Sequence, residues 1–212
     1  MTDIRSPFYI NQEFISQKTC DYIVEASKFN EPDEQESGLY LSKTQMLDPH
    51  CEQLLFNRLQ EFLPEIEQRF GIETRGVESM TISWHPGECV DGTDIRCANA
   101  VHAKGKWLKN KDRDLTCHLF LSTFNDNIDD GFDPDYEVFG GKLQYPQYDF
   151  SLNPQAGTLI VHPSGPHFIH AYSQVLVGDM FYVTFHIKAK EPHIYNPTDY
   201  PGTYQQWFSN LK

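Results

Sequence analysis

From residue 77 onward, the chain is a series of short strand-like segments separated by glycine, proline and aspartate. The clearest is 115–122, in which Leu, Cys, Leu and Leu alternate with Thr, His, Phe and Ser. This period of two predicts a half-buried strand. The other segments are residues 77–84, 140–145, 157–162, 167–177 and 179–188. Several strands at this interval predict an all-β sandwich or jelly roll.

The first 76 residues predict a short strand followed by two helices. Residues 8–10 are typical of a strand, and Ser16 is the expected N-cap of a short helix. A longer helix is predicted to begin after Asp48, where a proline occupies the first turn, and to end at Gly71. Its apolar residues recur at three- and four-residue steps, which predicts packing on a sheet, and Pro64 is expected to kink it.

The length of 212 residues favours one domain over two. We expect residues 1–76 to form a helical N-terminal support, residues 77–189 a β core, and residues 190–212 an extended C-terminal tail. The predicted fold class is therefore mainly β with flanking helices (α+β), in which the helices pack on the outside of the sheets.

The net charge excludes some partners. The chain has 17 Lys and Arg against 30 Asp and Glu, a balance of −13. Nucleic-acid binding and attachment to an anionic membrane both need clustered basic residues, so neither is expected. No apolar run is long enough to cross a bilayer, and the N-terminal residues contain no apolar signal-peptide core. We therefore expect a soluble cytoplasmic protein.

The cysteines predict free thiols. They are Cys20, Cys51, Cys89, Cys97 and Cys117, which are odd in number and lack zinc-finger or C-x-x-C spacing. In a reducing cytosol such residues stay unpaired, and those on apolar stripes act as small core fillers.

Three histidines lie within nine positions of each other: His162, His167 and His170. Imidazole is a good ligand for iron and related metals, so a metal site is one interpretation of this group. The other is that each histidine is a hydrogen-bonded structural residue. His118 lies on the 115–122 segment and points either into the predicted barrel or to solvent.

Several motifs, taken in order, resemble the Fe(II)/2-oxoglutarate dioxygenases, specifically the prolyl-hydroxylase-like branch. The resemblance covers most of the chain. It rests on Phe14-Ile15-Ser16, Trp84-His85-Pro86-Gly87, Leu119-Phe120-Leu121-Ser122, Gly140-Gly141-Lys142-Leu143-Gln144-Tyr145-Pro146, Gly157-Thr158-Leu159-Ile160-Val161 and Ser164-Gly165 with His170, Val175 and Gly178. The fold that this resemblance implies is a double-stranded β-helix, which is a jelly roll, with Fe(II) and 2-oxoglutarate as the expected cofactors.

The resemblance also implies a metal site of two histidines and one carboxylate, which leaves positions for 2-oxoglutarate and dioxygen. The distal histidine corresponds to His170. The other two ligands come from an H-x-D motif, whose position here reads Arg96-Cys97-Ala98. The basic residue that holds the 2-oxoglutarate carboxylate corresponds to Met180, two residues after Gly178.

These substitutions oppose iron binding at that position. Arginine only donates hydrogen bonds, so Arg96 is not a ligand. A guanidinium about 4 Å from a divalent ion costs about 8 kcal/mol of repulsion at an effective dielectric constant of 20. One interpretation is that Arg96 instead receives a carboxylate ligand without metal. The other is that it forms an ordinary ion pair with Asp91 or Asp94.

Two functions follow from these observations. We favour a non-catalytic barrel that serves binding or assembly, with a peptide or small molecule as the ligand. The alternative is an active hydroxylase of prolyl or other side chains. It would need a different register, in which Asp91, Asp94 or His102 joins His170 as a metal ligand and Lys142 replaces the missing base. The loop 104–111, with four lysines around a tryptophan, either contacts a partner or is solvated.

Overall fold

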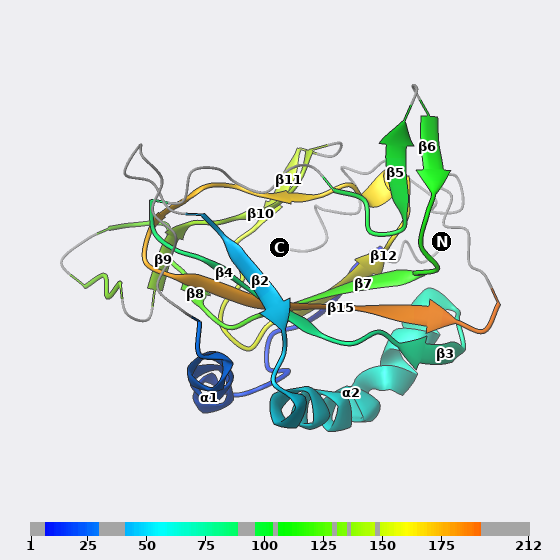
Figure 1. Cartoon of the computed structure of the whole chain (residues 1–212), viewed down its shortest axis with the longest axis horizontal. Coiled ribbons are helices and arrows are strands. Elements are labelled where there is room, and N and C mark those ends of the chain that lie inside the picture. The colour runs from blue at the N-terminus through cyan, green and yellow to red at the C-terminus, as the bar shows by residue number, and fades with distance from the viewer. Residues whose placement is uncertain are drawn as a thin grey trace, which may run out of the picture.

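The computed structural model describes residues 7–29, 41–88, 96–103, 106–128, 131–134, 137–146 and 149–191. The elements in chain order are β1 (Tyr9–Asn11), α1 (Gln17–Ser27), β2 (Lys43–Met46), α2 (Pro49–Phe70), β3 (Thr74–Val77), β4 (Thr81–His85), β5 (Ala100–Ala103), β6 (Lys106–Lys109), β7 (Leu115–Phe120), β8 (Thr123–Phe124), β9 (Glu137–Gly140), β10 (Leu143–Tyr145), β11 (Phe150–Leu152), β12 (Leu159–Pro163), a 3-10 turn (Pro166–Phe168), β13 (Ala171–Tyr172), β14 (Val175–Val177) and β15 (Met180–Ala189). The two helices lie together on one side of the strands (Figure 1).

The helix ends are those that the sequence predicts. The Ser16 side chain accepts a hydrogen bond from the backbone N–H of Thr19 and so caps α1. Asp48 caps α2 by accepting from two backbone N–H groups. Gly71 ends α2 with a φ of 65°, a left-handed conformation that favours glycine. Pro64 lies inside α2, which continues beyond it to Phe70.

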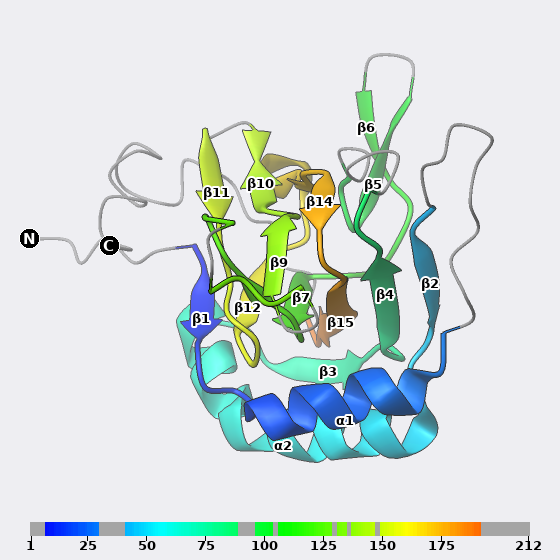
Figure 2. The same ribbon diagram turned by 90° about the vertical axis from the view of Figure 1, so that its left-hand side faces the viewer.

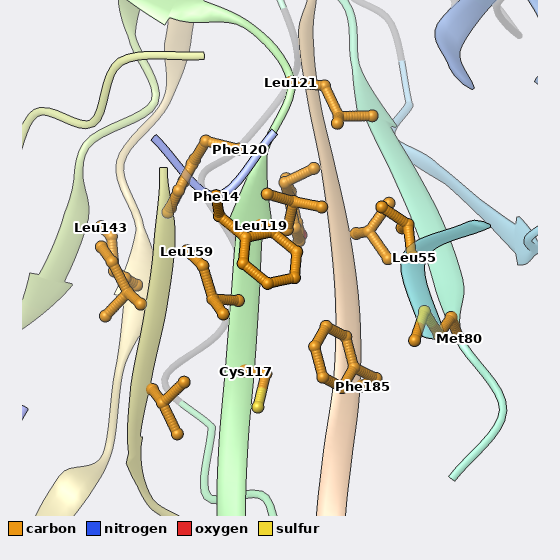
Figure 3. Packing of buried hydrophobic residues seen from close by; sticks show 14 of the residues in the cluster. Phe14, Leu55, Met80, Cys117, Leu119, Phe120, Leu121, Leu143, Leu159 and Phe185 are labelled. Atoms are coloured by element: carbon orange, nitrogen blue, oxygen red, sulfur yellow. The ribbon is translucent and has the colours of Figure 1, made fainter. Parts of the chain in front are cut away.

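Seven strands form the main sheet. Its order is β1-β12-β7-β15-β4-β2, and β3 pairs with the C-terminal end of β15. One face of this sheet packs on α1 and α2, where Cys117, Leu119, Phe185 and Leu55 belong to a single apolar cluster (Figure 3). All six residues of β7 are buried, because its other face is covered as well. The expectation of a half-buried strand was therefore wrong.

Shorter strands form the opposite layer. The strands β11-β10-β13 make one three-stranded sheet and β14-β9-β8 make another, on the side of the main sheet away from the helices (Figure 2). The hairpin of β5 and β6 projects from this end of the molecule (Figures 1 and 2). The barrel interior is the space between the main sheet and these short strands.

Three of the expected strands are interrupted. Residues 77–84 contain the end of β3 and the start of β4. Residues 140–145 are broken at Gly140 and Gly141, whose φ values of 91° and 70° suit glycine alone. A Cβ atom on Gly140 would lie 2.2 Å from the carbonyl oxygen of Gln174, so this crossing of the two segments requires glycine. Residues 167–177 form a 3-10 turn and two short strands, β13 and β14.

The predicted fold class is confirmed: the chain is mainly β, with its two described helices outside the sheets. The first 76 residues also contribute β1, β2 and most of β3 to the main sheet, in addition to the helices. Most of the predicted tail, from residue 192, lies outside the described residues. Neither α1 nor α2 combines the length and apolar character needed to cross a bilayer. Among the described cysteines, Cys20, Cys51, Cys97 and Cys117 are free thiols.

A candidate binding site inside the barrel

The two faces of the main sheet carry different chemistry. Thr184 pairs with His118 and His186 pairs with Thr116, so these side chains point to the same side, into the barrel. The alternate residues of β7, Cys117 and Leu119, belong to the apolar cluster on the helix side. The barrel interior therefore collects polar groups that are almost completely buried: His85, Thr116, His118, His162, Ser164, His170 and His186. Buried polar side chains of this number are informative, because burial costs free energy unless the groups are paired.

A cavity of about 580 Å³ opens into this interior. Its lining is rich in hydroxyl groups, from Thr44, Ser83, Thr116, Tyr172 and Tyr182 among others. The charged side chains that line it in the described part of the chain are cations, and no carboxylate is among them. In a protein with a net charge of −13, a cavity without acidic groups favours an anionic occupant.

The three cations of the cavity differ in how they are paired. Arg113 forms an ion pair with Glu78 at 2.6 Å, and Glu78 also lies 3.3 Å from Lys188. Burial raises the pKa of Glu78, but the hydrogen bond and the charge of Arg113 outweigh it and the pKa is lowered overall. Lys111 and Arg96 form no ion pair with any carboxylate that the structure describes. Lys111 and Arg96 are therefore the two cations of this cavity without a described carboxylate partner.

Arg96 lies directly opposite His170. The backbone N–H of Arg96 donates to the His170 carbonyl oxygen at 2.8 Å, and the His170 N–H donates back at 3.0 Å. Burial, assisted by the Arg96 charge, lowers the pKa of both His170 and His85 to about 4. Asp91 and Asp94, the other candidates for contact with Arg96, lie outside the described residues.

Three buried histidines meet at the inner end of the site. His118 comes from β7, His162 from β12, and His170 from the segment between the 3-10 turn and β13. Each offers a ring nitrogen, and these nitrogens lie within 4.8 Å of one another. The ring centroids are 5.4 Å apart for His118 and His162, 4.9 Å for His118 and His170, and 5.0 Å for His162 and His170. We call these residues the histidine cluster.

The hydrogen bonds of the histidine cluster fix the tautomers of His162 and His170. The Nδ1 atom of His162 lies 2.8 Å from the Pro163 carbonyl oxygen, and that of His170 lies 3.0 Å from the Phe168 carbonyl oxygen. A carbonyl oxygen only accepts, so each Nδ1 carries the proton and each Nε2 offers a lone pair. The Nδ1 atom of His118 lies 2.9 Å from the Tyr172 hydroxyl oxygen. Burial lowers the pKa of His118 and His162 well below the usual range, so all three rings are neutral at pH 7.

The other residues that the sequence suggested lie in different places. Met180 is buried, pairs with His85 and has its sulfur against Gly141. Lys142 forms an ion pair with Asp126 at 3.0 Å and is not among the residues that line the cavity. The backbone of His102 lies on β5, and its side chain is outside the description.

The structure changes the membership of the histidine group. His167 is exposed on the 3-10 turn and does not join His162 and His170. Its place is taken by His118, whose direction the sequence left open. The register of β7 and β12 identifies His118. His118 pairs with Ile160, and His162 lies two residues after Ile160, so both histidines face the inner side of the sheet. Pairing between distant strands is not visible in a single sequence.

Comparison with known proteins gives the fold. No protein-family model matches the chain, and no curated protein sequence matches it. A solved viral collagen prolyl hydroxylase from Paramecium Bursaria Chlorella virus-1, in complex with 2OG, is similar with a TM-score of 0.61 and 16% identity, over 87% of this chain and 96% of that one. A prolyl-4-hydroxylase from Pseudomonas putida is similar with a TM-score of 0.56 and 15% identity, over 88% and 94% of the two chains.

A third similar structure is a prolyl hydroxylase from Trichoplax adhaerens, in complex with a peptide fragment of the hypoxia inducible factor oxygen degradation domain. Its TM-score is 0.57 at 12% identity, over 87% of this chain and 84% of that one. The fold is thus a double-stranded β-helix, as the resemblance implied.

The described side chains do not supply the donor set of a 2-His-1-carboxylate iron site. The only group of His, Cys, Asp or Glu within ligating distance in the described ranges is the histidine cluster, which has no carboxylate. The cavity lining has none either, and Arg96 occupies the backbone position opposite His170. What the residues do offer is three neutral imidazole nitrogens, a set that fits a divalent transition metal.

Proposed function

We propose that this barrel binds a small carboxylate in its cavity through Arg96 and is not an iron- and 2-oxoglutarate-dependent hydroxylase of the usual kind. The observation that carries the proposal is the backbone bridge between Arg96 and His170, which brings a permanent cation to the cavity. In the resemblance described above, the position of Arg96 belongs to a metal ligand. A guanidinium at that position attracts an anion.

The chemistry of the cavity supports a carboxylate as the occupant. Arginine binds a carboxylate through two parallel hydrogen bonds, which are stronger than those between neutral groups. The surrounding hydroxyl groups add donors that a carboxylate or hydroxy acid accepts from. A cavity of about 580 Å³ lies within the range typical of small-molecule sites.

Calorimetry with the EDTA-treated protein tests this function, with succinate and 2-oxoglutarate as the probes. We expect measurable binding of at least one probe, and a loss of affinity of about tenfold or more in Arg96→Gln, since a charge-assisted bond is worth about 1.5–3 kcal/mol. Arg75→Gln is the matched control, because Arg75 is half exposed and pairs with Asp112 on the surface. No binding by the wild type, or equal binding by Arg96→Gln, would contradict the proposal.

The hydroxylase alternative needs a separate assay. The protein is supplied with Fe(II), 2-oxoglutarate and oxygen, and succinate formation is measured. We expect no turnover above that of a sample without protein. Turnover that is lost in His170→Ala would favour the alternative, in which Asp91, Asp94 or His102 completes the metal site.

A further inference from the structure

We propose that the histidine cluster is a metal site that binds one divalent transition ion through the Nε2 atoms of His118, His162 and His170. This inference does not depend on carboxylate binding by Arg96. It also differs from the ligand set that the resemblance implied, since His118 and His162 come from β7 and β12 and not from the segment that contains Arg96.

The first support is that two of the three Nε2 atoms have no partner among the described residues. The Nε2 atoms of His118 and His162 are buried and accept or donate no hydrogen bond within the described structure. These two side chains are 2% and 0% exposed, and His170 is 7% exposed. Buried nitrogens without a partner are rare, because burial removes the water that would otherwise bind them. An ion at the centre of the cluster would be a partner for all three.

The second support is the orientation of the rings. A histidine that binds a metal almost always donates its other N–H to a carbonyl, a carboxylate or water, which holds the ring in place. His162 and His170 have this arrangement, with the carbonyls of Pro163 and Phe168 as acceptors. The Tyr172 hydroxyl occupies the same position relative to His118. Each of the three Nδ1 atoms thus lies against a neighbouring oxygen atom, which leaves Nε2 as the ligand atom of each ring.

The distances suit a small ion after a modest adjustment. In a tetrahedral zinc site with Zn–N bonds of about 2.05 Å, the ligand nitrogens lie about 3.3 Å apart. The nitrogens of the cluster lie within 4.8 Å of one another, so each needs to move toward the centre by less than about 1 Å.

The ligands also select the class of ion. Neutral imidazoles suit zinc, cobalt, nickel and copper, whereas magnesium and calcium prefer oxygen ligands. Three protein ligands leave a fourth position open, as in catalytic zinc sites. His118 and His170 both line the cavity, so the open position faces the side from which an ion and an exogenous ligand would enter.

Cobalt titration of the EDTA-treated protein tests the site. We expect one Co²⁺ per chain with a visible absorption band of tetrahedral type, displaced by an equivalent of Zn²⁺. In His162→Gln the affinity for Co²⁺ is expected to fall by at least about 100-fold. Substitution of a residue that only contacts a ligand typically costs less than this. The matched control is His186→Gln, since His186 is also buried on the inner face but is not part of the cluster. Its affinity for Co²⁺ is expected to stay close to that of the wild type, because no described hydrogen bond joins the His186 side chain to the cluster.

A second measurement does not depend on how the variants fold. The proton NMR spectrum of the wild-type cobalt protein should show three strongly shifted Nδ1–H signals, one for each ligand imidazole. Absence of metal binding by the folded wild type would mean that ordered water satisfies the cluster and would overturn the proposal. Binding that persists in His162→Gln, or a spectrum without imidazole Nδ1–H signals, would overturn it too. Binding of Co²⁺ without any binding of succinate would contradict only the function proposed for Arg96.

Discussion

His85 makes the stability of this protein depend on pH, and the dependence can be calculated from its surroundings. The side chain is 3% exposed at the end of β4, and its Nε2 atom lies 3.1 Å from the Tyr182 hydroxyl oxygen. Burial first, and then the charge of Arg96, lowers the pKa of His85 from its ordinary value of 6.5 to about 4. Tyr172 also faces the ring, with centroids 6.1 Å apart. No group described around His85 favours its protonated form.

The sign of the effect follows from proton binding. Above pH 6.5 the histidine is neutral in both states and contributes nothing to the pH dependence. As the pH falls from 6.5 toward 4, the unfolded chain binds a proton that the folded chain does not, so the free energy of unfolding decreases. The slope approaches about 1.4 kcal/mol per pH unit for this one residue. The total loss is about 3 kcal/mol, a large part of the stability of a typical domain.

Urea unfolding at a series of pH values between about 7.5 and about 4 measures this effect. We expect His85→Gln to have a shallower slope than the wild type, by up to about 1.4 kcal/mol per pH unit. Glutamine keeps a hydrogen-bonding group for the Tyr182 hydroxyl. The control is His50→Gln, which removes an exposed imidazole at the start of α2. Equal slopes in His85→Gln and the wild type would refute the reasoning, because His85 would then not be held neutral by its surroundings.

Two further predictions concern the backbone. Gly157→Ala should destabilise the protein by about 1–3 kcal/mol, since Gly157 has a φ of 83° and a Cβ atom would lie 2.2 Å from the Ile15 carbonyl oxygen. Chemical unfolding measures this loss. The control is Gly76→Ala, because a Cβ atom there meets nothing within 4 Å. An unfolding midpoint of Gly157→Ala equal to that of the wild type would contradict the prediction. Pro64→Ala should raise the melting temperature, because alanine restores a backbone N–H inside α2 and is favoured over proline in a helix interior by about 3 kcal/mol. A lower melting temperature would mean that α2 needs proline for its packing.

The sequence predicted the local features well and the long-range ones poorly. Ser16, Asp48 and Gly71 cap their helices as expected, because capping depends on residues within one turn. The breaks within 140–145 and 167–177 depend on the crossing of two distant segments at Gly140 and Gln174, which no local pattern contains. β7 has polar and apolar residues in alternation, and this pattern does not distinguish a solvated face from a polar interior.

The sequence predicted the candidate site only in part. The resemblance to the dioxygenases placed Arg96 and His170 at one site, and the backbone bridge does bring them together. The histidine cluster was missed, because His118 and His162 are far apart in sequence and meet only through the register of β7 and β12. His167, which is nearest to His170 in sequence, lies outside the cluster. Proximity along the chain was a poor guide to proximity in the barrel.

The two faces of β7 and β15 separate two sets of side chains. Leu119 and Phe185 hold the main sheet against the helices, whereas His118 and Thr184 on the same strands face the cavity. A substitution on the cavity side changes the lining of the barrel, whereas one on the helix side changes the apolar layer. The lining of the cavity and the apolar layer are thus encoded at alternate positions of the same strands. Protein design can therefore change the cavity-facing residues of these two strands to fit another ligand and keep the helix-facing residues that form the apolar layer.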